Sequence, residues 1–201
     1  MSESSCQHLR QTIRHQTRER RRALLDTQQQ QAATAVCSRF TAHPNFANTH
    51  AIALYLSVDG ELSTAPLIEA CWQAKKQLYL PVLHPFCKGH LLFQRYQPHT
   101  TIVTNRLGIN EPQLNCSEVH PVNQLDMVIT PLVAFDRQGN RLGMGGGFYD
   151  RTFSHLGSHV QRVGIAHDLQ CYPKLPTAIW DQPLNRIFTP SELFEWPAKS
   201  V

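Results

Sequence analysis

Short apolar segments of strand length alternate with helix-forming stretches along this 201-residue chain, and this alternation constrains the fold most. The strand-like segments are 51–56, 78–80, 91–96, 127–130, 160–166 and 185–189. Residues 66–76, between the first two, begin with proline after Ser63 or Thr64 and carry one apolar stripe, which predicts a helix. Strands separated by helices favour parallel pairing. We therefore expect an α/β fold, a three-layer sandwich around a mainly parallel central sheet.

The first forty residues precede this pattern and differ from it. Residues 5–40 contain neither Gly nor Pro and are rich in Arg, Gln, Ala and Leu, which favour helix. Asp26-Thr27 is a plausible cap that divides the stretch into two helices. A chain of this length buries roughly 70% of its unfolded surface without disulfides. We expect a single domain, residues 1–201, with the N-terminal helical segment packed on it.

Basic charge is concentrated in the first of these helices. The formal net charge is +4, yet six arginines and one acid lie between Arg10 and Arg22, so the remaining chain is slightly acidic. Arg10, Arg14 and Arg18 have the i, i+4 spacing that places them on one helical face. We expect Arg10 and Arg14 to reach a polyphosphate, and the arginines from 18 to 22 to form a solvated face.

Cysteine spacing and the N-terminus indicate the cellular compartment. The six cysteines form no C-x-x-C pair, which argues against a zinc ribbon or a thioredoxin-like motif. The N-terminus has no apolar signal-peptide region, and the longest apolar run is six residues, far short of a membrane span. We expect a cytoplasmic protein with reduced thiols.

Half of the ten glycines fall within nine residues, 139–147, just before a predicted helix at 148–155. Glycines permit positive φ and let backbone N–H groups approach a ligand, and a helix N-terminus attracts anions. Arg141 and Arg151 flank the loop as charged donors. The loop lacks the Lys-Ser/Thr pair of a Walker A motif, and Phe148 replaces the third glycine of the dinucleotide fingerprint. We interpret it as a phosphate-binding loop; the alternative is a flexible surface loop.

Three acids are candidates for ligand contacts. Asp150 stands beside the glycine loop, where a carboxylate could hold Mg²⁺, although a first-turn acid is also favoured by the helix dipole alone. The neighbouring residues give weaker support for a ligand contact at Asp181, because an Asp at the start of a Pro-containing turn needs no function. Glu61 follows the strand-like segment 51–56, at the edge where open α/β sheets bind ligands. It is a plausible contact for a heterocycle, or merely a turn acid.

Taken together, these segments resemble the 5-formyltetrahydrofolate cyclo-ligase (methenyltetrahydrofolate synthetase) family, especially its bacterial branch. The main motif is Asn140-Arg141-Leu142-Gly143-Met144-Gly145-Gly146-Gly147-Phe148-Tyr149-Asp150, preceded by Ala134-Phe135-Asp136. Shorter matches follow in the right order along nearly the whole chain: Leu9-Arg10, Asp59-Gly60-Glu61-Leu62-Ser63-Thr64, Leu80-Pro81, Glu111-Pro112, Val163-Gly164-Ile165-Ala166 and Trp180-Asp181.

The resemblance implies a ligase that converts 5-formyltetrahydrofolate and ATP to 5,10-methenyltetrahydrofolate, ADP and phosphate, with Mg²⁺ required. ATP would phosphorylate the formyl oxygen, and N10 of the folate would then displace phosphate as the ring closes. It also implies small-molecule substrates only, no membrane or nucleic-acid partner, and a monomer.

The family pattern further implies a role for each matching residue. ATP contacts would come from Arg10, Arg14, Arg141, Leu142, Gly143, Met144, Gly145, Gly146, Gly147, Phe148 and Tyr149, with Arg141 and Tyr149 acting in catalysis. The folate would be bordered by Glu61, Met144, Gly145, Gly146, Gly147 and Phe148, with Glu61 on the pterin. Asp150 and Asp181 match the magnesium carboxylates.

Some positions depart from the family pattern. Cys6 stands where many members carry Lys or Arg, which weakens the N-terminal ATP contact or shifts it to Arg14. Met144 and Gly146 also replace residues that are often basic, so Arg141 and the metal would carry more of the charge stabilisation.

Two other functions stay open from the residues alone. One is a non-catalytic α/β module that binds RNA or another polyanion through residues 10–22, although nucleic-acid-coating proteins usually spread basic charge over a broad face. The other is a different phosphate-handling enzyme on a similar scaffold, since a fold alone does not fix function.

Overall fold

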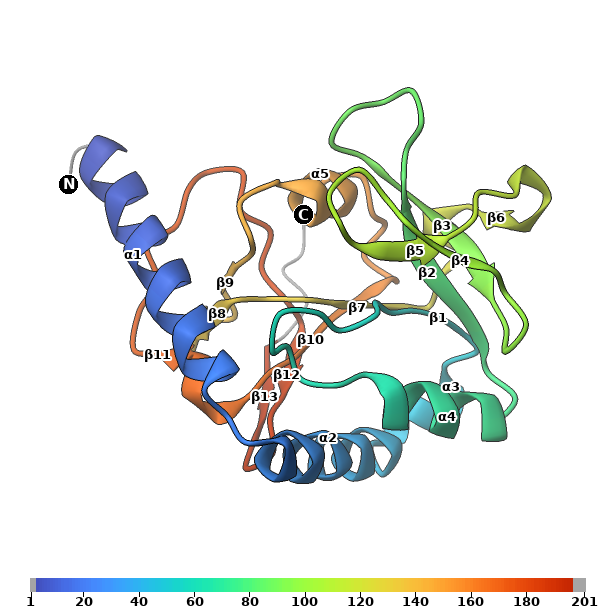
Figure 1. The fold of residues 1–201 in the computed structure, drawn as a ribbon, viewed down its shortest axis with the longest axis horizontal. Coiled ribbons are helices and arrows are strands. Elements are labelled where there is room, and N and C mark those ends of the chain that lie inside the picture. The colour runs from blue at the N-terminus through green and yellow to red at the C-terminus, as the bar shows by residue number, and fades with distance from the viewer. Residues whose placement is uncertain (1–2, 197–201) are drawn as a thin grey trace.

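The structure, a computed structural model, describes residues 3–196, and an eight-stranded sheet forms its centre (Figure 1). The order of strands is β13-β12-β10-β7-β1-β2-β3-β6. The five middle strands run parallel: β12 (Arg186–Phe188), β10 (Gln161–Ile165), β7 (Met127–Thr130), β1 (Ala51–Ala53) and β2 (Gln77–Leu83). The outer strands β13 (Leu193–Glu195), β3 (Leu91–Tyr96) and β6 (Val119–His120) pair antiparallel. The predicted α/β fold with a mainly parallel central sheet is confirmed.

Three helices cover one face of this sheet. They are α2 (Asp26–Thr41), α3 (Pro44–Asn48) and α4 (Ala65–Gln73). Phe40 of α2 and Leu67 of α4 are buried in one core cluster with Ile52 of β1. Side chains alternate along a strand, so Ala51 and Ala53 point to the opposite face and belong to a second cluster.

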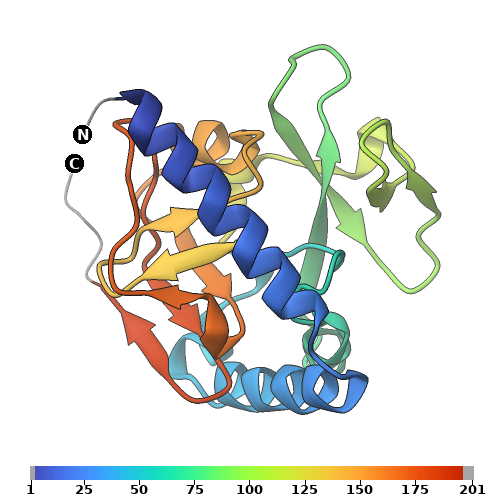
Figure 2. The ribbon, with the colours of Figure 1, turned by 60° about the vertical axis from the view of Figure 1, so that its left-hand side comes forward.

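A second layer covers that opposite face. It contains α5 (Phe148–Phe153) and a three-stranded sheet of β11 (Cys171–Tyr172), β8 (Ala134–Asp136) and β9 (Arg141–Leu142). Phe153 of α5 and Phe135 of β8 are buried there with Val128 of the central sheet. The long helix α1 (Glu3–Arg22) crosses over this layer, as Figure 2 shows, and contacts β8 and the 3-10 turn η3 (Asp168–Gln170).

Several element boundaries differ from those predicted. Leu25, in extended conformation, is the N-cap of α2, so the helix begins at Asp26 and its cap lies one residue before the predicted Asp26. Strand β2 continues through Pro81 to Leu83. It pairs with β1 only over residues 77–79, so its edge beyond that point is open and tolerates a residue without an N–H.

Two hairpins project from the sheet beside α5 (Figure 1). One joins β2 to β3, and the other is β4 (Ile102–Thr104) paired with β5 (Asn110–Pro112). The chain then returns through the 3-10 turns η1 (Cys116–Glu118) and η2 (Val122–Gln124). Within residues 3–196, no helix combines the length and the apolar character needed to cross a bilayer.

Candidate functional site

A cavity of about 1150 Å³ opens where the carboxyl ends of the parallel strands meet α1, the glycine loop and the β4–β5 hairpin. Tyr55 and Leu56 follow β1, Leu83 ends β2, and Pro131 and Leu132 follow β7; all five line it. In open α/β sheets this is the edge at which ligands bind, because the loops that leave the strands gather there. Most of the residues implied by the family pattern also line this cavity.

The glycine loop forms one wall of the cavity between β9 and α5. Gly145 has φ 104° and Gly147, the N-cap of α5, has φ 67°, conformations that other residues rarely adopt. At Gly146 an added Cβ would lie 2.7 Å from the Phe148 ring, so a larger residue here requires that ring to move. Helix α5 ends at Phe153 rather than 155, and its six residues give a small dipole. The loop therefore presents mainly backbone to the cavity, as a phosphate cradle requires.

Arg141 is a buried cation in this wall. Arg141 is only 5% exposed, and its Nη2 donates to Asp150 Oδ1 at 2.8 Å. Burial lowers the pKa of Arg141 while the Asp150 charge opposes that effect, and a guanidinium stays charged at neutral pH. Its buried Nε finds no hydrogen-bond partner among the described residues. An anionic ligand would satisfy such a donor.

Two arginines of α1 enter the cavity at its other side. Arg10 donates from Nη1 to Asp181 Oδ2 at 2.5 Å and from Nη2 to Asp181 Oδ1 at 2.9 Å. Arg14 Nε donates to the carbonyl oxygen of Gly143 at 2.8 Å, which places its guanidinium against the glycine loop. Both side chains line the cavity, and their contact with a polyphosphate stays a prediction.

The two predicted magnesium carboxylates differ in their surroundings. Asp150 lines the cavity, and its Oδ1 accepts from Arg141 and from the backbone N–H of Gln182 at 3.1 Å. No hydrogen bond from the described residues reaches its Oδ2. Asp181 is not among the lining residues, and both of its oxygens are engaged by Arg10. Asp150 thus fits a metal ligand, whereas Asp181 anchors Arg10 in this structure, and its metal role stays a prediction.

The described residues contain no cluster of three or more acidic, His or Cys side chains arranged to hold a metal. Mg²⁺ does not need one, because it is commonly held by one or two carboxylates together with substrate phosphates and water. A single cavity-lining carboxylate beside a phosphate loop is compatible with that mode of binding.

Glu61 lines the cavity away from Arg10 and is nearly buried. Its Oε2 accepts from the backbone N–H of Val58 at 3.1 Å, and its side chain is 6% exposed. Burial raises the pKa of Glu61 to about 7, against the opposing effect of Arg21. The buried Tyr149 phenol faces Glu61, and burial raises its pKa, so the phenol is neutral. This end of the cavity offers an acidic acceptor beside a neutral donor.

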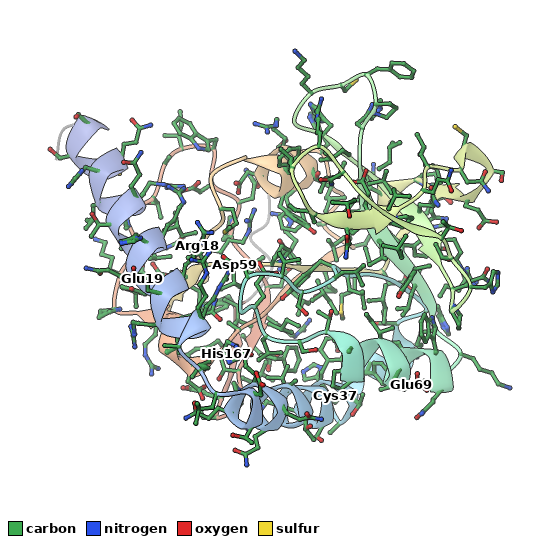
Figure 3. All side chains as sticks on the ribbon, in the orientation of Figure 1. Arg18, Glu19, Cys37, Asp59, Glu69 and His167 are labelled. Atoms are coloured by element: carbon green, nitrogen blue, oxygen red, sulfur yellow. The ribbon has the colours of Figure 1, made fainter. Side chains whose placement is uncertain are left out.

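The prediction that residues 18–22 form a solvated face is wrong for Arg21, although Arg20 and Arg22 are exposed. Arg21 is completely buried, and Arg18, Arg21 and Arg22 all bind the carboxylate of Asp59. Figure 3 shows Arg18 and Asp59 on the inner side of α1 and Glu19 on the outer side. The chain turns back toward the helix at Asp59, whose φ is 56°. The Asp59 carboxylate therefore lies beside all three arginines.

Two further candidate residues lie outside the cavity lining. Leu142 is 1% exposed, packs with Ile13 and Leu175, and does not line the cavity, so the structure gives no support to its contact with ATP. Arg151 is also absent from the lining. It donates to the carbonyl oxygens of Gly89 and Gly146 and joins the β2–β3 hairpin to the glycine loop.

Several residues that line the cavity were not predicted from the sequence, because they lie in segments without a clear pattern. Asn105 and Glu111 face the cavity from the β4–β5 hairpin, joined by a 2.8 Å hydrogen bond from Asn105 Nδ2 to Glu111 Oε2. Lys174 and Trp180 come from the loop after β11. The turn chemistry around Asn105 and the pair Glu111-Pro112 were the available signals, but neither indicates a direction for the side chain.

The basic helix gives little support to polyanion binding. Arg10, Arg14, Arg18, Arg21 and Arg22 each donate to a partner within the chain. Much of the charge that suggested this alternative is therefore directed toward the cavity or toward Asp59.

Comparison with known proteins agrees with this geometry. The model of the 5-formyltetrahydrofolate cyclo-ligase family matches residues 6–190. The chain is 52% identical over 180 residues to 5-formyltetrahydrofolate cyclo-ligase of Escherichia coli (strain K12), covering 89% of this chain and 99% of that protein. It is 49% identical over 176 residues to the Haemophilus influenzae protein of the same name, covering 87% and 94%. The solved 5,10-methenyltetrahydrofolate synthetase of Aquifex aeolicus superposes with a TM-score of 0.82 at 26% identity, covering 96% of this chain and 95% of that one.

Proposed function

The chain belongs to the 5-formyltetrahydrofolate cyclo-ligase family, and from this premise we propose that it closes the ring of 5-formyltetrahydrofolate to form 5,10-methenyltetrahydrofolate. The reaction consumes ATP, requires Mg²⁺ and releases ADP and phosphate. As a ligase of this family, the protein forms a C–N bond and acts in folate and one-carbon metabolism.

One observation carries the proposal: Arg10, Arg14, the glycine loop with Arg141, and Glu61 all line a single cavity, and Glu61 lies beside Arg21, further along α1 than Arg10 and Arg14. The guanidinium of Arg141 lies 5.8 Å from the centroid of the Tyr149 ring, and the charge of Arg10 lowers the pKa of Arg141. The charge of Glu61 in turn raises the pKa of Tyr149. A triphosphate at the cationic end and a pterin at the acidic end would therefore meet beside Arg141.

The cationic end suits the triphosphate of ATP. Backbone N–H groups of residues 143–147 and the side chains of Arg10 and Arg14 surround it. Helix α1 would hold the nucleotide against the loop, because Arg14 is already hydrogen-bonded to Gly143. Met144 and Phe148 border the same wall and are available to both substrates.

The proposed reaction has two bond-forming steps. The formyl oxygen attacks the γ-phosphorus, and the bond to the ADP oxygen breaks. N10 then attacks the activated formyl carbon and loses its proton, while phosphate departs with the former formyl oxygen. Little covalent work falls to the protein, which must align the reacting atoms and neutralise developing charge. Arg141 provides that positive charge, and Tyr149 provides a neutral hydrogen-bond donor.

Asp150 is the residue we propose for Mg²⁺, because it lines the cavity and retains an oxygen without a hydrogen bond from the described residues. Bound there, the ion would offset the negative charge of the phosphates.

Glu61 is the residue we propose for the pterin. A carboxylate can accept two hydrogen bonds from the N–H edge of an aminopyrimidinone. We also propose a monomer that acts in the cytoplasm with small molecules as its only partners.

The test is a direct assay. The purified protein is mixed with 5-formyltetrahydrofolate, ATP and Mg²⁺, and the near-ultraviolet absorbance of the methenyl product is followed together with ADP. Each of the three additions is omitted in turn. Product that forms without ATP, or no product with all three present, contradicts the proposal. A filter-binding assay with RNA at two salt concentrations tests the polyanion alternative, since such binding weakens steeply with salt.

A further inference from the structure

Arg21 is a fully buried cation that the proposed reaction does not use. Its side chain is 0% exposed and lies at the C-terminal end of α1. Its Nε donates to the carbonyl oxygen of Asp59 at 2.8 Å, and its Nη2 donates to Asp59 Oδ2 at 3.0 Å. A buried guanidinium stays charged and is costly without a counter-charge, so its surroundings must compensate it.

Asp59 alone does not balance this charge. The same carboxylate accepts from Arg18 Nε at 2.7 Å and from Arg22, so three cations share one acid. The next acid is Glu61, whose Oε1 lies 3.8 Å from Arg21 Nη2. Arg21 therefore has two counter-charges, and one of them is the carboxylate proposed to bind the pterin.

The turn that carries Glu61 is built tightly against α1. Gly60 has φ 71°, and an added Cβ would lie 3.1 Å from the carbonyl oxygen of Arg21. Gln29 Nε2 donates to the carbonyl oxygens of both Arg21 and Gly60, each at 3.2 Å. The Arg21 side chain adds a further link to this turn, because its Nε donates to the carbonyl oxygen of Asp59, two residues before Glu61.

We propose that Arg21 is a positioning residue for the folate end of the cavity: it fixes the turn of residues 59–61 and holds Glu61 in its ionised form. The inference rests on the proposed function in one respect, the binding of the pterin by Glu61. The effect of Arg21 on the ionisation of Glu61 does not depend on that function and can be measured without substrate.

Other charged and titratable groups near Glu61 also affect its ionisation. Asp59 favours the protonated acid, whereas Arg18 favours the carboxylate from a greater distance. Tyr55 and Tyr149 face Glu61 as buried neutral phenols. His167, which lies near the end of α1 in Figure 3, contacts the backbone of Gly60, and burial lowers its pKa. Arg21 is thus the main cation that opposes burial at Glu61.

The experiment compares Arg21→Met with Arg22→Met. Both variants remove one arginine from Asp59, but Arg22 is half-exposed and has no ion pair with Glu61 among the described residues. Glu61 is titrated in the ligand-free protein by carbon NMR of labelled glutamate carboxyls, with Glu61→Gln to assign the signal. The KM values for 5-formyltetrahydrofolate and ATP are measured against pH.

We expect Arg21→Met to move the Glu61 midpoint upward by about one pH unit, which lowers the ionised fraction at pH 7 about fivefold. The KM for 5-formyltetrahydrofolate should rise by the same factor, while the KM for ATP stays near wild type. Arg22→Met should leave the midpoint and both KM values near wild type. Equal shifts in the two variants, or no shift in Arg21→Met, overturn the proposal.

Arg21→Lys covers the case in which the Met variant does not fold. Lysine retains the charge but not the two-point fork. It should keep the Glu61 midpoint near wild type and still raise the KM for 5-formyltetrahydrofolate; an unchanged KM overturns the positioning role. If wild-type protein makes no methenyl product, the proposed function fails, and the carboxyl titration still reports on Arg21.

Discussion

Arg10 and Asp181 form a two-point ion pair that joins the first helix to the loop after β11, with N–O distances of 2.5 and 2.9 Å. Both side chains are largely buried, and Arg10 also donates to the carbonyl oxygen of Pro176 at 2.9 Å. The pair fixes the side chain proposed to meet the nucleotide. We therefore expect Asp181 to act on the nucleotide through Arg10, whereas Asp150 lines the cavity directly.

This difference separates the two acids experimentally. We expect Asp181→Asn to raise the KM for ATP about tenfold, the size of one lost charge-assisted contact, and to leave the Mg²⁺ dependence unchanged. Asp150→Asn should instead increase the Mg²⁺ concentration needed for half-maximal rate. Initial rates over a grid of ATP and Mg²⁺ concentrations distinguish the two. A large shift in Mg²⁺ dependence for Asp181→Asn would restore it as a metal ligand.

Arg141 should control turnover. Because it is buried beside the place where charge develops, Arg141→Ala should lower kcat by about 10²- to 10³-fold, the range seen when one preorganised donor is removed. Arg137→Ala is the control, since that arginine is exposed, pairs with Glu192 and does not line the cavity. Circular dichroism and thermal unfolding show whether each variant folds. An Arg141→Ala enzyme with near-normal kcat would contradict the assignment.

Local patterns in the sequence predict much of the fold and of the glycine loop. Apolar periodicity places the central strands, and clustered glycines indicate a loop that needs positive φ at Gly145 and Gly147. The burial of Arg21 could not be predicted, because its partner Asp59 lies 38 residues away and charged residues are seldom buried without a partner. Helical spacing alone indicates which residues share a face but not what that face contacts.

Gly147 tests whether the shape of the loop matters for the nucleotide. Gly147 has φ 67° and Gly108, in the β4–β5 hairpin, has φ 73°, so alanine at either position costs about 1–2 kcal/mol of backbone strain. A Cβ at Gly147 would also lie 2.8 Å from Arg151 Nη1, whereas none of the surrounding atoms lies within 4 Å at Gly108. We expect Gly147→Ala to raise the KM for ATP and Gly108→Ala to leave it unchanged. Equal effects on ATP would show that general destabilisation is the cause.

Glu61 should make both folate binding and stability depend on pH. Its pKa is raised by burial to about 7, so below that pH the protonated acid can no longer accept two hydrogen bonds from the pterin. The KM for 5-formyltetrahydrofolate should then rise, approaching about tenfold per pH unit. Glu61→Gln should bind the folate weakly at every pH and lack this dependence. An unchanged pH profile in Glu61→Gln would mean that another group controls binding.

The stability of the ligand-free protein should respond to Glu61 in the opposite sense. The folded state binds the Glu61 proton more tightly than the unfolded state, whose pKa is near 4.5. This contribution to the free energy of unfolding is fully present below pH 4.5 and is lost as pH rises to about 7, by on the order of 3 kcal/mol. Urea unfolding of wild type and Glu61→Gln between pH 5 and 8 measures the difference. Because glutamine does not titrate, the variant should gain stability relative to wild type as pH rises; a constant difference between the two proteins would contradict the raised pKa.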